Sequence, residues 1–326
     1  MKAAISVNAE GPLGVRFAEV ATPAPGPDEI KVHVKATALN RADLMQTLGL
    51  YPAPAGVSAE IPGLEYAGEV TEVGARVTRW KLGDRVMGLV GGGAWAEVLV
   101  THEREAIAIP AHLSFAEAAA LPEAFSTAFD ALVLQAGMTV NHRVLIHAVT
   151  SGVGTAAIQL CALFGARAIG TGRNAEKLAR TEALGLTRTV LVKDGKFAAK
   201  VKQHTEGQGC DVALDLVGGD WFTETIDAMA PRGTVMLVGL VAGGKAEIPL
   251  RSVLGKRLNI IGTALRSRPL EEKIVVARAF EQRLVPAFVS GQLRPIIDAT
   301  LPMLELPAAL QRLASNDTFG KLVLTW

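Results

Sequence analysis

Hydrophobic and polar residues alternate along the first third of the chain. Three runs show this alternation most clearly, at 30–38, 66–77 and 94–100. Such alternation is typical of strands with one buried face, so residues 1 to about 110 are predicted to be mostly β. Proline-rich segments at 21–27 and 51–62 are predicted to be loops, because proline has no N–H for a sheet or a helix interior.

A different pattern starts at residue 144, in the stretch VLIHAVTSGVGTAAIQLCALFGA. The apolar run 144–146 predicts a short buried parallel strand. Over 153–164 apolar residues recur at helical spacing, and a glycine then ends the predicted helix. Gly152 and Gly154 permit the sharp turn between strand and helix. The N–H groups at the start of that helix point at the turn, which favours a bound pyrophosphate.

The glycine motif of this turn is incomplete. In the strict pattern G-x-G-x-x-G, Val149 and Ser151 stand at the first and second glycine positions, and only Gly154 fits. An ordinary strand, turn and helix of an α/β core therefore remains an alternative to a dinucleotide site.

The strand predicted next, at 166–172, indicates which dinucleotide is bound. In dinucleotide-binding units the end of this strand meets the adenosine ribose, and an NAD site has a carboxylate there for the 2′-hydroxyl. Here the strand ends in Gly172, Arg173 and Asn174, with Lys177 one helical turn later. Cationic and small polar groups suit a 2′-phosphate, so NADPH is predicted as the cofactor. The alternative is a solvated start to a surface helix.

Helices and strands alternate through the rest of the second half. Strands are predicted at 189–192, 211–217, 234–239 and 257–263, and a helix at 221–229. This alternation predicts an α/β fold with a doubly wound parallel sheet, in which 257–263 is the edge strand.

Three further segments connect or close the two halves. A helix at 114–134, broken at Pro122, is predicted to join them. A long helical segment follows at 269–289. The tail is predicted to form a short helix at 306–314 and a closing strand at 321–324, which return to the β-rich part.

Length, charge and cysteine content narrow the function. With 326 residues the chain is predicted to form two domains. The formal net charge of +1 gives no basic field that would gather nucleic acid or anionic lipid. Two distant cysteines argue against a disulfide framework and for a reducing compartment. No leader or membrane span is evident, so a soluble cytoplasmic protein is expected.

Several ordered segments resemble the zinc-free, zeta-crystallin-like quinone oxidoreductases of the medium-chain dehydrogenase/reductase superfamily. They are ALNRADLMQTLG (38–49), IPGLEYAG (61–68), LPEAFSTAF (121–129), 144–160, LRSR (265–268) and GKLVL (320–324). The resemblance covers essentially the whole chain. It implies a GroES-like β-rich catalytic domain (1–121 and 266–326), a Rossmann NADPH-binding domain (122–265), and NADPH:quinone oxidoreductase activity. It also implies a homodimer or homotetramer joined through the Rossmann sheet edge.

The same resemblance assigns roles to individual residues. Asn40, Tyr51 and Thr127 are expected to line the nicotinamide and substrate pocket. The cofactor is expected to contact Thr150, Ser151, Gly152, Val153, Gly154, Arg173, Lys177, Gly239, Leu240, Leu265, Arg266 and Asn316. The chain departs from its relatives at Val192, where they often have a tyrosine near the adenosine phosphate. NADPH preference therefore depends on Arg173 and Lys177.

No metal is expected. Zinc-dependent relatives have a cysteine where this chain has Asn40, and a G-H-E motif where it has Gly63, Leu64 and Glu65. A structural zinc site needs four clustered cysteines, and this chain has two. None of the six histidines has ligand spacing, so each is interpreted as a surface or satisfied core residue.

Hydride transfer can proceed without a metal, because the nicotinamide carries the chemistry and the protein orients the reactants. Quinones are acceptors of this kind, since their reduced oxygens take protons from water. Tyr51 is the candidate proton donor or stacking platform, or else a loop aromatic that covers the core edge. Two alternatives to a quinone reductase stay open: a 2-enoyl thioester or enal reductase, and a non-catalytic NADPH-binding protein like the crystallin relatives.

Overall fold

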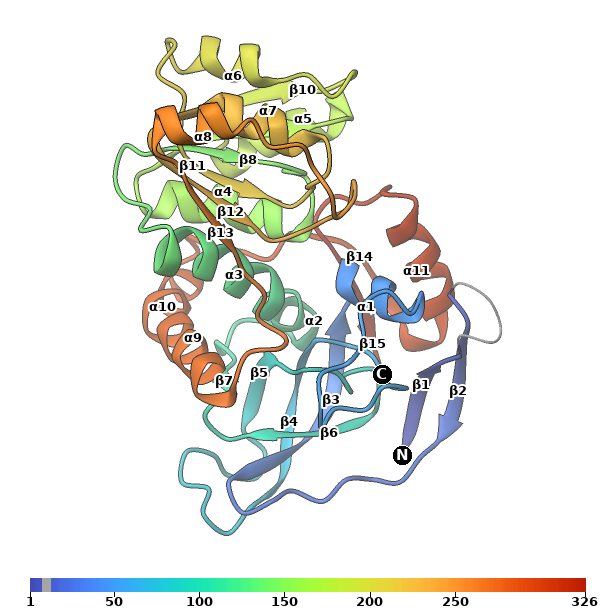
Figure 1. The fold of residues 1–326 in the computed structure, drawn as a ribbon. Coiled ribbons are helices and arrows are strands. Elements are labelled where there is room, and N and C mark those ends of the chain that lie inside the picture. The colour runs from blue at the N-terminus through green and yellow to red at the C-terminus, as the bar shows by residue number, and fades with distance from the viewer. Residues whose placement is uncertain (8–12) are drawn as a thin grey trace. The chain divides into compact units, whose positions relative to one another are not determined.

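The computed structural model describes residues 1–7 and 13–326 as two compact units (Figure 1). The first comprises Met1–Ser126 and Leu265–Trp326, and the second comprises Thr127–Ala264. The two units divide at 126/127 and 264/265, and the sequence-based domain boundaries are 121/122 and 265/266. The first of these divisions lies inside a continuous helix, α3 (Pro122–Phe129).

The second unit is built on a six-stranded sheet. Its strand order is β10 (Arg188–Leu191), β9 (Arg167–Gly172), β8 (Arg143–Ile146), β11 (Cys210–Asp215), β12 (Met229–Leu237) and β13 (Asn259–Gly262). Every neighbouring pair is parallel. The predicted parallel sheet, its strands and the edge position of β13 are confirmed.

Helices connect these strands. They are α4 (Gly152–Leu163), α5 (Ala175–Thr181), α6 (Ala198–His204), α7 (Trp221–Ala228) and α8 (Leu250–Lys256), with a 3₁₀ turn, η3 (Glu182–Leu184). The predicted strand–turn–helix at 144–164 is confirmed. The short helices α6 and α8 were not predicted from the sequence, and α8 has no buried residue from which a pattern would arise.

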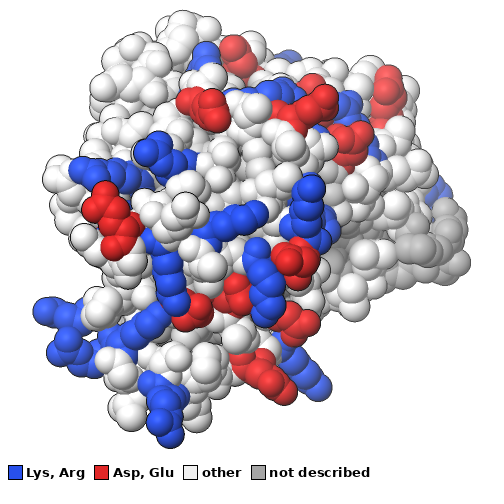
Figure 2. Space-filling view, turned by 90° about the horizontal axis from the view of Figure 1, so that it is seen from above, with Lys and Arg blue, Asp and Glu red and all other residues white. Residues whose placement is uncertain are grey.

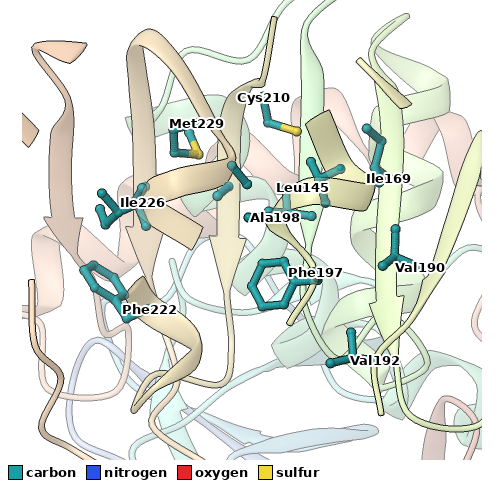
Figure 3. Close-up of a cluster of buried hydrophobic side chains, with 14 residues drawn as sticks. Leu145, Ile169, Val190, Val192, Phe197, Ala198, Cys210, Phe222, Ile226 and Met229 are labelled. Carbon is teal, nitrogen blue, oxygen red and sulfur yellow. The ribbon is translucent and has the colours of Figure 1, made fainter. Parts of the chain in front are cut away.

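A cluster of buried apolar side chains fixes α6 and α7 to the sheet (Figure 3). Phe197 and Phe222 belong to this cluster together with Leu145 of the inner strand β8 and Val190 of the edge strand β10. Val192, directly after β10, belongs to the same cluster and is 3% exposed. Its side chain is therefore used in the core, at the position where relatives often have tyrosine.

The first unit has a seven-stranded sheet and a separate hairpin. Its strands are β3 (Glu29–Ala38), β4 (Glu65–Val73), β5 (Arg85–Leu89), β6 (Val98–His102), β7 (Ile107–Ala108), β14 (Ile297–Pro302) and β15 (Lys321–Thr325), and β1 (Lys2–Ser6) pairs with β2 (Val15–Glu19). β15 pairs with β3, so the prediction that the tail returns to the β-rich part is confirmed.

The helices of this unit mostly match the predicted segments. They are α1 (Arg41–Thr47), α2 (Phe115–Ala119), α3, α9 (Leu270–Arg283), α10 (Val285–Val289) and α11 (Leu306–Ala314), with a 3₁₀ turn, η4 (Met303–Glu305). The predicted break at Pro122 separates α2 from α3, and a π-helical segment, η2 (Asp130–Gln135), continues α3. The helical stretch predicted at 269–289 is divided between α9 and α10.

The charged side chains on the surface agree with the small net charge of the chain (Figure 2). On the face seen in Figure 2, lysine and arginine are interspersed with aspartate and glutamate, in keeping with a net charge of +1. Cys161 and Cys210 are buried free thiols. Among the residues described, none of the helices has the length and apolar character that crossing a membrane requires.

Candidate active site

The turn after β8 leads directly into the N-terminus of α4. Ser151 is the N-cap of α4, and its Oγ accepts a hydrogen bond from the Gly154 N–H at 3.1 Å. A Cβ on Gly154 would lie 2.6 Å from the Ala148 carbonyl oxygen, so only glycine allows the helix to begin this close to the turn. The N–H groups of Gly152 and Val153 are in the first helical turn and have no carbonyl within the helix to bond. They are donors for a phosphate group.

The carboxyl ends of β9 and β12 reach the same edge of this parallel sheet as the end of β8. Gly239 follows β12 and donates its N–H to the Asp215 carbonyl oxygen at 3.2 Å. A Cβ there would lie 2.5 Å from the Leu216 carbonyl oxygen, so glycine lets the two strand ends approach. Leu240 is 53% exposed. The predicted cofactor residues of this unit thus gather where open α/β sheets bind ligands.

The end of β9 carries the predicted 2′-phosphate residues. Arg173 is exposed and follows the last strand residue directly. Asn174 is the N-cap of α5 and accepts the Lys177 N–H at 3.0 Å, which puts Lys177 in the first helical turn. Glu176 lies in that turn as well. It is a carboxylate near the strand end that the sequence analysis did not consider.

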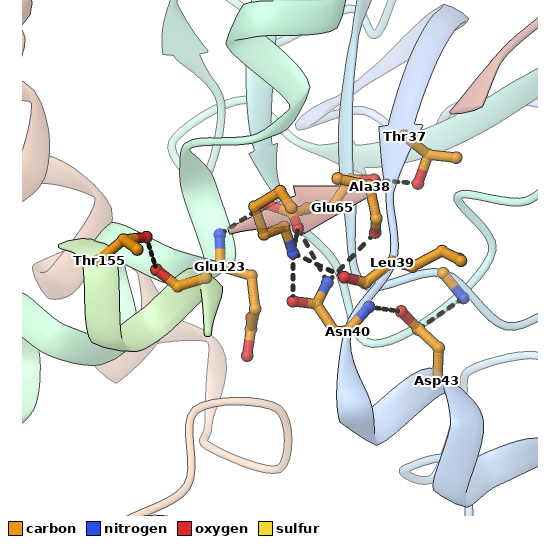
Figure 4. Close-up of polar contacts among 11 residues, drawn as sticks. Thr37, Ala38, Leu39, Asn40, Asp43, Glu65, Glu123 and Thr155 are labelled. Carbon is orange, nitrogen blue, oxygen red and sulfur yellow. Dashed lines mark hydrogen bonds and ion pairs between the residues drawn. The ribbon is translucent and has the colours of Figure 1, made fainter. Parts of the chain in front are cut away.

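The ammonium group of Lys321 is buried in the first unit, and its three partners, Leu39, Asn40 and Glu65, are labelled in Figure 4. Lys321 Nζ lies 2.6 Å from Asn40 Oδ1, 2.6 Å from Glu65 Oε1 and 2.8 Å from the Leu39 carbonyl oxygen. Its side chain is 5% exposed and that of Glu65 is fully buried. All three ammonium hydrogens therefore have an acceptor, and the charge has a buried counter-ion.

The amide of Asn40 is fixed by the same network. Its Nδ2 donates to Glu65 Oε1 at 2.8 Å and to the Ala38 carbonyl oxygen at 3.2 Å. Both amide hydrogens are thus used within the protein. Glu65 Oε2 also accepts the N–H of Glu123 at 2.8 Å, in the first turn of α3. Asn40 and Glu65 together tie α1, β4 and α3 to the closing strand.

Asp43 is a second buried carboxyl beside this network. It accepts the N–H of Asn40 at 2.8 Å and that of Gly63 at 3.2 Å. Burial raises its pKa to about 7, although the hydrogen bond from Asn40 and the charge of Lys321 oppose the rise. The side chain forms the capping box of α1 and sets the backbone position of Asn40.

Tyr51 and Arg266 are brought together in the first unit. The Arg266 guanidinium lies 5.1 Å from the centre of the Tyr51 ring. Its Nε donates to the Gly91 carbonyl oxygen at 2.7 Å, and its Nη2 donates to Gln46 Oε1. Burial raises the pKa of Tyr51 and the charge of Arg266 lowers it, with a net rise. The phenol therefore keeps its proton at neutral pH.

Arg266 also borders a pocket within the first unit. The pocket is lined mostly by apolar residues, which include Leu64, Val90, Pro122 and Leu265, and by five polar side chains, Glu105, Glu123, Ser126, Arg266 and Lys273. An apolar pocket with few polar groups is the usual form of a small-molecule site. Leu265 and Arg266 were both predicted as site residues from the sequence.

Asn316 and Thr127 are two further predicted residues. Asn316 has a φ of 60° and accepts a hydrogen bond from Arg41 Nη2 at 2.6 Å through its Oδ1. Thr127 belongs to the second unit and is 8% exposed. Asn40 and Tyr51 belong to two different sets of contacts in the first unit, one around Lys321 and one around Arg266.

Sequence reasoning missed Lys321 and Asp43 as members of the site. A lysine inside the apolar closing strand is a detectable feature, because lysine is almost never fully buried without a partner. The partner itself is not readable from local sequence. In the part of the chain that the structure describes, no three His, Cys, Asp or Glu side chains are grouped as ligands of one metal ion.

Two family models match the chain. The description "Alcohol dehydrogenase GroES-like domain" matches residues 26–111, and "Zinc-binding dehydrogenase" matches residues 152–281. A quinone oxidoreductase of Pseudomonas aeruginosa is 32% identical over 322 residues, which cover 96% of each chain. The predicted combination of a GroES-like domain with a Rossmann-type sheet is confirmed.

Solved structures of two kinds are similar to this one. A quinone oxidoreductase of Pseudomonas syringae pv. tomato DC3000 has a TM-score of 0.89 at 30% identity, covering 100% of this chain and 99% of that chain. JamJ enoyl reductase has a TM-score of 0.88 at 25% identity, covering 99% of each.

Proposed function

Since this chain belongs to the quinone oxidoreductase-like group of the medium-chain dehydrogenase/reductase superfamily, we propose that it is an NADPH-dependent quinone reductase that works without zinc. It is an oxidoreductase of a family that uses nicotinamide cofactors. The observation that carries the proposal is the phosphate-binding turn, in which Ser151 caps α4 and Gly154 approaches Ala148, followed by Arg173 and Lys177 at the next strand end.

The residues of the chain bind and orient the reactants in this proposal. The bound nicotinamide supplies the reducing equivalents. The N–H groups of Gly152 and Val153 bind the pyrophosphate, and Arg266, which contacts the Tyr51 ring, also lines the pocket that we assign to the substrate. The Tyr51 phenol is protonated and can donate a hydrogen bond to a reduced oxygen. Water can supply the remaining protons.

The first prediction from this proposal concerns zinc. The residues at the position of the zinc-dependent relatives' ligands do not fit the metal, because a buried ammonium is bound there by Asn40 Oδ1 and Glu65 Oε1. A second cation beside Lys321 would be repelled. The purified protein is expected to lack stoichiometric zinc by elemental analysis, and chelators are expected to leave its rate unchanged. Zinc that is lost together with activity would contradict the proposal.

The second prediction concerns cofactor choice. Charge-assisted hydrogen bonds to phosphate contribute ~1.5–3 kcal/mol each, and less where the side chain is exposed, as Arg173 is. Wild-type protein is expected to prefer NADPH over NADH by roughly tenfold or more in kcat/KM. Arg173→Ala combined with Lys177→Ala should raise the KM for NADPH and leave that for NADH nearly unchanged.

Glu176→Gln is the matched control for this prediction, since it changes the charge of the same helical turn without removing a cation. It is expected to retain the NADPH preference. Equal efficiency of both cofactors in the wild type, or equal loss with both in the double variant, would show that Arg173 and Lys177 do not bind the 2′-phosphate.

A second function has support from the similarity to JamJ enoyl reductase. An enoyl thioester reductase needs an acid for the carbon next to the carbonyl, and Tyr51 is the candidate. It also needs a basic site for a coenzyme phosphate. Initial rates of NADPH oxidation with quinones, enals and enoyl thioesters separate the two activities. Tight NADPH binding without turnover of any of them would support the non-catalytic alternative.

Self-association through β13 is the remaining proposal. This edge strand and α8 expose Leu250 at 74%, Leu254 at 80% and Ile260 at 39%. An exposed edge strand flanked by apolar side chains favours pairing with a second copy. We expect a dimer or a tetramer in sedimentation, and the double change Leu254→Lys with Ile260→Lys should give monomers. A wild-type monomer at micromolar concentration would contradict this.

A further inference from the structure

His147 is a fully buried histidine at the start of the phosphate-binding turn. It follows β8 directly, and its backbone N–H donates to the Leu214 carbonyl oxygen of β11 at 3.1 Å. Its Nδ1 lies 2.8 Å from Thr171 Oγ1 in β9, and its Nε2 lies 2.8 Å from Thr225 Oγ1 in α7. The side chain thus links β9 and α7 at the end of β8, at the edge of the sheet where the predicted cofactor residues gather.

The neighbouring hydroxyl groups fix the protonation of this ring. The one hydrogen of the Thr225 hydroxyl is directed to the Trp221 carbonyl oxygen at 3.0 Å or to Asp215 Oδ2 at 3.5 Å. Thr225 Oγ1 therefore accepts from Nε2–H. The other nitrogen, Nδ1, then accepts from the Thr171 hydroxyl. His147 is held as a neutral ring, and burial lowers its pKa while Asp215 opposes this.

Aromatic neighbours keep the ring from turning. Its centre lies 4.9 Å from the ring of Phe197 and 5.5 Å from that of Trp221, both in edge-to-face contact. Rotation of the imidazole would break both hydrogen bonds and this packing. The ring is therefore held in one orientation between Thr171 and Thr225.

Thr171 holds the turn on both sides of a strained residue. Ala148 has a φ of 46°, in the left-handed region that a residue with a Cβ seldom adopts. On one side of it, the His147 ring is bonded to the Thr171 hydroxyl. On the other side, the Val149 N–H donates to the Thr171 carbonyl oxygen at 3.1 Å. The left-handed Ala148 persists because both flanking residues are fixed to the same residue of β9.

This strained residue sets the position of the anion-binding groups. The Ala148 carbonyl oxygen accepts the Ser151 N–H at 2.9 Å, and its backbone is the surface against which Gly154 packs. We propose that His147 is a positioning residue for cofactor binding, which holds Ala148 in its left-handed conformation so that the first N–H groups of α4 meet a pyrophosphate. The proposal rests on the proposed function for its ligand.

Substitution of His147 by Asn or by Gln, each of which can retain one of the two hydrogen bonds of the ring, tests the proposed positioning role directly. Asn presents an oxygen near the position of Nδ1 and retains the Thr171 link, whereas Gln reaches toward Thr225 and retains that link alone. His147→Leu, which retains neither, is expected to weaken NADPH binding about tenfold or more in calorimetry. His147→Asn should recover more of the affinity than His147→Gln, because Thr171 is the residue that flanks the turn.

Phe222→Leu is the matched control, since Phe222 lies in the core cluster that contains Phe197, a neighbour of the His147 ring. It should lower the melting temperature without changing NADPH affinity. Hydrogen exchange of residues 148–153 supplies a readout that needs no cofactor, and it should accelerate in His147→Leu and stay unchanged in Phe222→Leu. Unchanged exchange and unchanged affinity in His147→Leu, or equal changes in the control, would overturn the inference. If the wild type binds no NADPH but the exchange pattern holds, the proposed function fails and the positioning role stands.

Discussion

Replacing Ser151 by Asp is expected to abolish measurable NADPH binding while leaving the protein folded. Asp is as good an N-cap as Ser, and its charge is favourable at a helix N-terminus, so α4 should keep its stability. The same carboxylate lies where the pyrophosphate must bind. Placing like charges together costs several kcal/mol, so the affinity should fall by roughly a hundredfold or more.

Titration calorimetry with NADPH measures this effect. Ser151→Asn is the matched control, because Asn has nearly the size of Asp, caps a helix equally well and carries no charge. It should bind NADPH with nearly wild-type affinity. If Ser151→Asp binds as tightly as Ser151→Asn, the pyrophosphate does not lie at the start of α4.

Among the variants proposed for this protein, Lys321→Met is expected to lower the free energy of unfolding the most. It removes the ammonium from between Asn40 and Glu65, and it leaves the Glu65 carboxylate fully buried with hydrogen bonds but no counter-ion. Removing one partner of a buried ion pair costs ~3–5 kcal/mol. The free energy of unfolding, measured with urea, should fall by about this amount.

Two further variants test whether the unpaired Glu65 carboxylate causes this loss of stability. Adding Glu65→Gln to Lys321→Met should recover part of the stability, because the uncompensated charge is then absent. Lys31→Met removes the partner of Glu72 in an exposed pair and should cost less than about 1 kcal/mol. A Lys321→Met protein as stable as Lys31→Met would show that the buried pair of Lys321 and Glu65 does not stabilise the first unit.

Sequence reasoning located the strand, turn and helix that we propose to bind the pyrophosphate, even though the glycine motif is incomplete. The buried strand and the helix period were readable, and Gly154 marks a point in this turn where backbone must approach backbone. The other glycine positions are replaceable here because Ala148 takes the left-handed conformation itself, supported by neighbours in β9 and α7. That support comes from distant segments, so no local pattern predicts it.

The polar network of the first unit was not predictable for a similar reason. Glu65 follows a loop near the start of the chain, and Lys321 lies almost at its end, so their pairing depends on β15 adding to β3. The sequence does predict the return of the tail, but not which side chains then meet. The helices α1, α6 and α8, which were not predicted, have seven residues each, and such short lengths carry little periodicity.

Initial-rate measurement of NADPH oxidation by the wild-type protein tests the central proposal most directly. The assay compares ortho- and para-quinones with enals and enoyl thioesters, with chelator present throughout. The proposal predicts saturable oxidation of NADPH with quinones, a slower rate with NADH, and little activity on the enoyl thioesters. Turnover of enoyl thioesters in preference to every quinone would contradict it.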